Sequence, residues 1–202
     1  MFWVAAAAVA QFVAPQPREM WFRKHDTPEK YLSKRPMALV WLRLTIRPDG
    51  TLRSCEIEES SGEPGLDSYT CDLTRSRAQF RPARLADGTQ TYGVYRVPIL
   101  WSLEPAFPDP EGDLMLTVNA LPRGVRSPQF LRLALAVDAA GHIGECASQP
   151  PPFRDAPPNN TKLVSIACAQ LLKDYTATPA LDDDGKPVAS IQIASVVFSK
   201  PK

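Results

Sequence analysis

The sequence predicts an α+β fold made of two tandem ββαβ units, each a three-stranded antiparallel sheet packed on a helix. A strand hairpin that occurs twice is the first observation behind this prediction. A common pattern of residues after each hairpin is the second. The composition agrees with folded domains, because 44% of the 202 residues are hydrophobic and 22% are charged.

The first hairpin spans residues 43–55. Apolar and polar residues alternate on both sides of Pro48, Asp49 and Gly50, a combination typical of tight turns. The second hairpin lies 91 positions later and has the turn DAAG in place of RPDG. Leu44, Ile46, Gly50, Leu52 and Cys55 recur there as Leu135, Val137, Gly141, Ile143 and Cys146.

The residues after each hairpin recur with a longer offset of 97 positions. Leu66, Ser68, Cys71, Pro82, Ala83, Asp87 and Gly88 recur as Leu163, Ser165, Cys168, Pro179, Ala180, Asp184 and Gly185. The additional residues fall in the proline-rich stretch 148–160, which only a surface loop would tolerate. We interpret the two halves as diverged copies of one unit. A chance similarity in biased sequence is the alternative.

The first unit is expected to span residues 27–104. A short helix begins near Thr27 and Pro28, which are favourable cap and first-turn residues. Apolar residues at helical spacing predict a helix at 66–80, after the hairpin. Residues 92–103 are rich in β-formers and predict the third strand.

The second unit is expected to span residues 114–200. Its boundary with the first is the acidic, proline-rich stretch 104–113. After the second hairpin we expect a helix at 163–174 and a final strand at 188–199.

Residues 1–17 form an apolar N-terminal segment. Its apolar run of about fourteen residues is too short to span a bilayer. A secretion signal is one interpretation, since Ala8, Val9 and Ala10 have the small-x-small form that signal peptidase accepts, although no Lys or Arg precedes the run. An ordered apolar arm is the alternative.

Short motifs of the first unit resemble a known family. They are a Pro-Asp-Gly turn, Ser-Ser-Gly before Leu-Asp, Phe-Arg-Pro-Ala before an Asp-Gly turn, and Val-Pro-Ile in the last strand. These motifs comprise Pro48, Asp49, Gly50, Ser60, Ser61, Gly62, Leu66, Asp67, Phe80, Arg81, Pro82, Ala83, Asp87, Gly88, Val97, Pro98 and Ile99. Over residues 27–103 the chain resembles the C-terminal domain of TonB proteins. Residues 130–199 share the resemblance only through the internal repeat.

The resemblance implies a periplasmic α+β domain that grips an extended segment of an outer-membrane receptor. Full-length TonB proteins also have a transmembrane helix and a long proline-rich spacer, and we expect neither from this sequence. The expected function is therefore non-catalytic protein binding in the periplasm, extending to TonB-dependent transport. A structural or dimerisation module of the cell envelope, pairing as a homodimer through sheet edges, is the alternative.

Four cysteines occupy matching places in the two units. Cys55 and Cys146 lie in the return strands of the hairpins, and Cys71 and Cys168 lie in the helices that follow. Four cysteines allow three connectivities. The repeat selects Cys55 with Cys71 and Cys146 with Cys168, because a helix packed on its preceding strand can bring these side chains together. Four buried thiols in a reduced chain are the alternative, and zinc is disfavoured because no pair has CxxC spacing.

The sequence carries no recognisable motif for catalysis or for a cofactor. Its two histidines, His25 and His142, lie in no ligand or catalytic pattern, so we expect no enzyme activity and no cofactor or metal. We interpret the acidic run 182–184 as a solvated turn. The formal net charge of +1 provides no basic surface for nucleic acid.

Binding is expected at exposed sheet edges, where an extended peptide can add a strand. The candidate edges are the third strands at 92–103 and 188–199. Pro98 interrupts the first of them, since proline has no N–H to give. The candidate binding residues are Val94, Arg96, Val97, Ile99, Ile191, Ile193 and Val196. Alternatively, the two edges pair with each other or with another copy of the chain.

Overall fold

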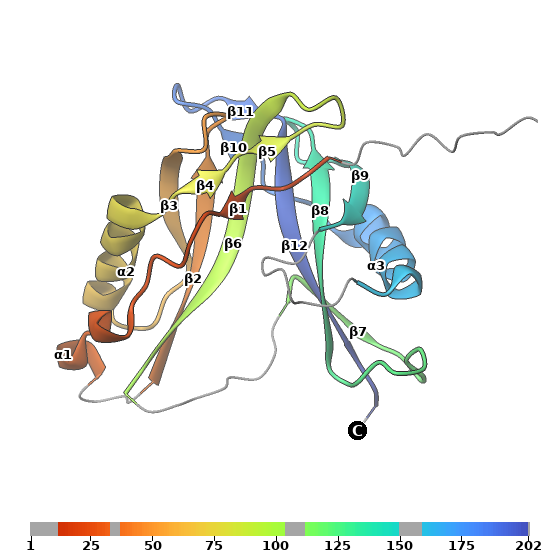
Figure 1. Cartoon of the computed structure of the whole chain (residues 1–202), viewed down its shortest axis with the longest axis horizontal. Helices are drawn as coiled ribbons and strands as arrows, with labels where there is room; N and C mark the ends of the chain where they lie inside the picture. The colour runs from red at the N-terminus through yellow and green to blue at the C-terminus, as the bar shows by residue number, and fades with distance from the viewer. Residues whose placement is uncertain (1–11, 33–36, 104–111, 150–158, 202) are drawn as a thin grey trace, which may run out of the picture.

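The computed structural model describes residues 12–32, 37–103, 112–149 and 159–201. These residues form an α+β fold, which confirms the predicted fold class. Both halves place a hairpin, a helix, two short strands and a long strand in the same order (Figure 1). No helix in these ranges is long and apolar enough to cross a membrane.

The first half contains the predicted hairpin, helix and third strand. Its elements are β1 (Gln16–Pro17), η1 (Lys24–Asp26), α1 (Glu29–Leu32), β2 (Met37–Ile46), β3 (Leu52–Glu59), α2 (Pro64–Arg77), β4 (Phe80–Arg81), β5 (Ala83–Arg84) and β6 (Gln90–Ser102). The hairpin pairs Leu44 with Cys55. Gly50 closes its turn at φ +88°, a conformation that glycine adopts readily.

The second half repeats this order after one additional strand. Its elements are β7 (Leu114–Thr117), β8 (Gln129–Val137), β9 (Ile143–Ser148), α3 (Thr161–Asp174), β10 (Ala180–Leu181), β11 (Pro187–Val188) and β12 (Ser190–Ser199). The hairpin pairs Leu135 with Cys146, the residues that match Leu44 and Cys55 in the sequence. The Asn160 side chain caps α3 by accepting hydrogen bonds from two backbone N–H groups of its first turn.

The two halves share one sheet, because the third strands of the two units pair with each other, the alternative stated above for the two sheet edges. The main strand order is β3-β2-β6-β12-β8-β9. At its centre, β6 and β12 run parallel and pair residues 92–94 with 190–192. Beyond this junction the two strands diverge (Figure 1). This pairing gives the backbone groups at the start of each third strand partners in the other half.

Each half has its own core, and the two cores lie on opposite faces of the shared sheet. Ile191 and Ile193 of β12 belong to the core that contains α2. Ala194, Val196 and Phe198 belong to the core that contains α3. Successive residues of a strand point to opposite faces, so the two helices cover opposite faces. In each half the helix therefore covers one face of the sheet, and the opposite face is left for other segments to cover.

An N-terminal arm, residues 12–22, crosses the face on which α2 lies (Figure 1). Phe12 and Ala14 are buried, and the Val13 N–H donates a 2.8 Å hydrogen bond to the Arg84 carbonyl oxygen. A Cβ atom at Gly93 would lie 2.7 Å from the Pro15 ring, so the close approach of arm and β6 requires glycine. Residues 12–17 thus form an ordered apolar arm, the alternative to a secretion signal. Residues 1–11 of the predicted signal segment lie outside the described residues.

Candidate binding groove along strand β6

Among the strands that the structure describes, none pairs with one edge of β6 over about half of its length. The opposite edge pairs with β2 from Gly93 to Ser102. The other edge pairs with β12 at residues 92–94. Within the described part of the chain, no strand pairs with this edge at residues 95–101.

The N-terminal arm and β8 border this stretch and form a groove of about 340 Å³. It is lined by Pro17, Arg18, Glu19, Met20, Trp21, Phe22, Tyr95, Val97, Pro98, Ile99 and Arg132. The lining is mostly apolar with a few charged groups, a composition typical of sites that bury a ligand.

Aromatic packing makes the floor of the groove rigid. The Trp21 ring lies 5.7 Å from the Phe80 ring and 6.5 Å from the Tyr95 ring, measured between centroids. Trp21 Nε1 donates a 3.2 Å hydrogen bond to Thr74 Oγ1 of α2. Because α2, β6 and the arm all hold this ring, the groove exists before any ligand enters it.

Two of the predicted binding residues, Val97 and Ile99, line the groove. They share a face of β6 with Tyr95, since side chains alternate along a strand. Pro98 lies between them in the unpaired stretch and is exposed. Its place fits the preference of proline for edge strands.

The other two predicted residues of β6 lie elsewhere. Val94 is fully buried and pairs with Gln192 of β12, so it is not at the unpaired stretch. Arg96 is on the opposite face of β6, in a charged cluster between the two halves. Neither residue lines the groove.

The expected open edge at 188–199 is not present. One edge of β12 pairs with β8 at residues 190–198. The other edge pairs with β6 at residues 190–192 and with β7 at residues 196–199. The predicted residues Ile191, Ile193 and Val196 are buried. The edge is occupied because β6 and β7 of the same chain pair with it, and the pairing with β6 is the alternative stated above for the two edges.

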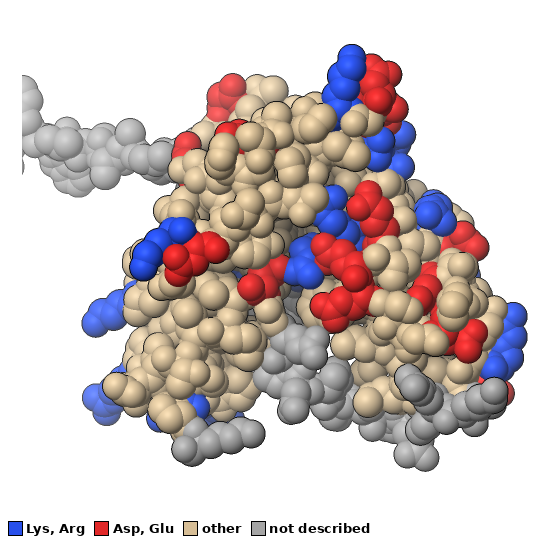
Figure 2. All heavy atoms as spheres, turned by 180° about the vertical axis from the view of Figure 1, so that it is seen from behind, with Lys and Arg blue, Asp and Glu red and all other residues tan. Residues whose placement is uncertain are grey.

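A charged cluster ties the halves together on the other face of the sheet, where Figure 2 shows acidic and basic side chains gathered between them. Arg96 pairs with Glu58 and with Asp113, whose side chain is 2% exposed. Asp113 Oδ2 accepts a 2.6 Å hydrogen bond from the Ser195 N–H. Arg43, also buried, donates a 2.7 Å hydrogen bond to the Thr178 carbonyl oxygen. These partners give Arg96 a structural role.

Both expected cysteine pairs form disulfides. Cys55 bonds Cys71, and Cys146 bonds Cys168. Each bond joins the return strand of a hairpin to the following helix. The disulfides therefore hold α2 and α3 on their own hairpins.

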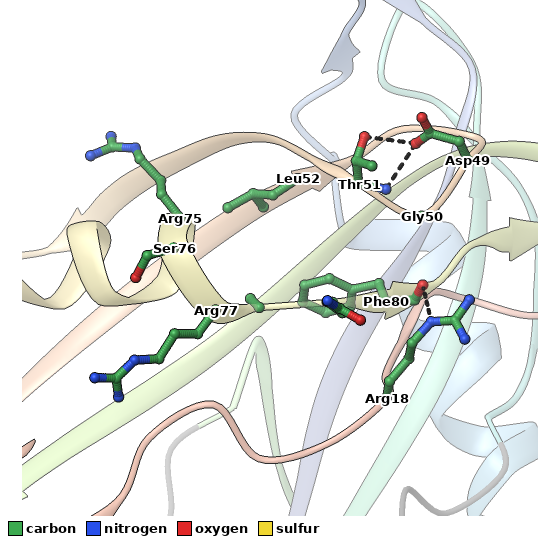
Figure 3. Close-up of a pocket in the computed structure, with 11 residues that line it drawn as sticks. Arg18, Asp49, Gly50, Thr51, Leu52, Arg75, Ser76, Arg77 and Phe80 are labelled. Atoms are coloured by element: carbon green, nitrogen blue, oxygen red, sulfur yellow. Dashed lines mark hydrogen bonds between the residues drawn. The ribbon is translucent and has the colours of Figure 1, made fainter.

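A second hollow of about 450 Å³ lies where α2 ends beside the β2–β3 turn (Figure 3). Its three arginines already have partners. Arg18 Nε donates to the Phe80 carbonyl oxygen at 3.2 Å, and Arg75 pairs with Asp72 of α2.

Arg77, the third arginine of this hollow, pairs with Asp26 at 2.7 Å. The hydrogen bond from Arg77 lowers the pKa of Asp26 below its ordinary value. The hollow therefore brings together hydrogen-bonded structural groups and no nucleophile with its base.

The histidines are not in a catalytic or metal-binding arrangement. Exposed His142 lies 3.2 Å from Asp138 across its own turn, and exposed His25 lies 4.0 Å from Asp26. Among the residues that the structure describes, no group of three or more His, Cys, Asp and Glu side chains could hold a metal ion.

Sequence reasoning missed two parts of the groove. The arm residues Trp21 and Phe22 carried a signal, since adjacent aromatic residues between charged ones suggest a buried anchor. Arg132 carried none, because its role depends on the pairing of the two halves.

Comparison with protein families identifies the part of the chain that carries the β6 edge. Residues 28–103 match the model of the Gram-negative bacterial TonB protein C-terminal. This part of the chain is similar to the TonB C-terminal domain. The match runs from the start of α1 to the end of β6. No curated protein and no solved structure matches the chain at a significant level.

TonB C-terminal domains are non-enzymatic protein-interaction domains associated with the Gram-negative envelope. Their partners include outer-membrane receptors. The matched residues supply Tyr95, Val97 and Ile99 to the groove, whereas the arm residues and Arg132 come from outside the matched range.

Proposed function

We propose that the protein is a non-catalytic periplasmic binder that receives an extended segment of an envelope protein, such as an outer-membrane receptor, by strand addition to β6. The observation that carries the proposal is the edge at residues 95–101, which no described strand pairs with, beside an apolar groove. Backbone N–H and C=O groups along such an edge supply affinity, and side chains that enter the groove supply selectivity.

The second half supports this proposal because it binds a strand of its own chain in the corresponding place. β7 runs parallel to β12 and pairs residues 114–117 with residues 196–199. In the repeat, Val196 corresponds to Ile99. The edge of β6 near Ile99 therefore corresponds in the repeat to the edge of β12 that pairs with the short apolar strand β7.

The cysteines support the proposed compartment. All four are in disulfides, and disulfides persist in oxidising compartments such as the periplasm. A role in TonB-dependent transport would follow if the segment belongs to a receptor of that system.

A peptide of the β7 sequence, DLMLTV, is a suitable probe because the same residues add to β12 within the chain. We expect the peptide to increase hydrogen-exchange protection of the amides at residues 95–101. The substitution Val97→Glu places a charge in the groove and should weaken binding by at least about tenfold. Val188→Glu is the matched control, since Val188 is also half-buried but lies in β11, away from the groove.

The proposal fails if the peptide protects other amides only, or if Val97→Glu and Val188→Glu have the same effect. Absence of binding to the native protein would also contradict strand addition.

A homodimer through the same edge is the second candidate. Met20 and Leu103, which flank the groove and the end of β6, are 67% and 48% exposed. An unpaired edge beside exposed apolar residues can also pair with a second copy. Sedimentation velocity over a range of concentrations separates the candidates, because a monomer at every concentration contradicts the homodimer.

A further inference from the structure

The groove along β6 contains a cation that no described residue neutralises. Arg132 reaches the groove from β8, in the other half of the chain. Its guanidinium carbon lies 5.0 Å from the centroid of the Tyr95 ring, a cation–π contact that places the charge over the groove floor. Among the described carboxylates, none forms an ion pair with Arg132.

The guanidinium group of Arg132 also has a nitrogen without a hydrogen-bond acceptor. Arg132 Nε is buried and has no acceptor among the described residues. A buried donor without an acceptor destabilises a protein, and a ligand that supplies the acceptor removes this penalty. Glu19 also lines the groove, but it is exposed and does not pair with Arg132. A ligand carboxylate would supply both the acceptor and the opposite charge.

Strand β7, which pairs with an edge of β12, also carries a carboxylate beside its apolar residues. Asp113 directly precedes β7, and its carboxylate pairs with Arg96 while accepting the hydrogen bond from the Ser195 N–H. Arg96 belongs to the first half, whereas β7 pairs with β12 of the second half. An arginine from the opposite half thus holds the carboxylate at the start of an added apolar strand.

We propose that the β6 groove selects an extended apolar segment of a partner protein that carries a carboxylate, and that Arg132 pairs with this carboxylate. The inference rests on the proposed function and adds to it the chemistry of the ligand. It also assigns recognition to a residue outside residues 28–103, which are similar to the TonB C-terminal domain. The groove is then a joint product of both halves.

The test compares the peptides DLMLTV and NLMLTV by fluorescence anisotropy on the full chain. Loss of a charged hydrogen-bond partner should weaken binding of the asparagine peptide to the native protein by about 10- to 100-fold. Arg132→Gln should remove this preference, so that both peptides bind alike. Arg132→Lys should retain part of it. The matched control is Arg126→Gln, which removes the same charge from an exposed position and should leave the preference intact.

The outcomes separate the two proposals. Equal binding of both peptides to the native protein overturns the role of Arg132 and leaves strand addition standing. Binding of neither peptide overturns both. Loss of the preference in Arg126→Gln as well would mean that general charge, and not Arg132, attracts the peptide, which also overturns the inference. If Arg132→Gln does not fold, the comparison of the peptides on the native protein and on Arg132→Lys decides.

Discussion

Replacing Trp21 by alanine tests whether the N-terminal arm is an integral part of the fold. The Trp21 side chain is 6% exposed and contacts the rings of Phe22, Phe80 and Tyr95. Truncating a buried tryptophan removes its burial energy and leaves a cavity, at a cost of about 3–5 kcal/mol. Loss of its hydrogen bond to Thr74 contributes within that range. We therefore expect Trp21→Ala to lower the free energy of unfolding by about 4 kcal/mol.

The assay is urea denaturation followed by far-ultraviolet circular dichroism, which does not depend on the tryptophan signal. Met20→Ala is the matched control, because Met20 is adjacent in the chain but 67% exposed, and it should cost less than about 0.5 kcal/mol. A cost below about 1 kcal/mol for Trp21→Ala would show that the arm detaches without unfolding the domain. The groove would then not be preformed, and the reasoning above would be refuted.

Three further predictions concern the disulfide within the second half, the ion pair between the halves and the ion pair of Asp26 with Arg77. Replacing both cysteines of the second disulfide by serine should cost about 3 kcal/mol in urea denaturation, given its sequence separation of 22 residues; an unchanged midpoint would contradict it. Asp113→Asn should cost about 3 kcal/mol in the same assay, since it leaves the charge of Arg96 with one partner fewer. In the folded state the hydrogen bond from Arg77 lowers the pKa of Asp26. The ionised Asp26 therefore stabilises the fold above the unfolded pKa of about 4, and this stabilisation is lost as the pH falls through the lower folded pKa. Arg77→Gln should therefore reduce the loss of stability in this acid range, as measured by urea midpoints at several pH values, and an unchanged pH profile would contradict the assignment.

The parts of the fold that local patterns determine could be predicted from the sequence. Alternation around Gly50 and Gly141 predicted both hairpins, and the matched positions of the cysteines predicted both disulfide pairs. These features depend on residues close together in the chain or on the repeat itself. These parts of the structure therefore follow from short-range patterning and from the comparison of two similar segments.

The junction of the halves could not be predicted in this way. It depends on pairing between β6 and β12, which are far apart in the sequence and have no pattern that specifies one partner over another. The pairing of β7 with the edge of β12 could not be predicted for the same reason. Alternation along β6 already places Arg96 on the face opposite Val97 and Ile99, so which of these side chains share a face could be predicted from the sequence.

The difference between the edges of β6 and β12 determines how many ligands one chain can hold. Two identical chains arranged about a symmetry axis would have equivalent edges, and each would be open or closed together with the other. In this protein both halves belong to one polypeptide, and they are free to differ: β7 pairs with β12, while no strand among the described residues pairs with β6 at residues 95–101. A complex formed at that position should therefore have a stoichiometry of one partner segment to one chain.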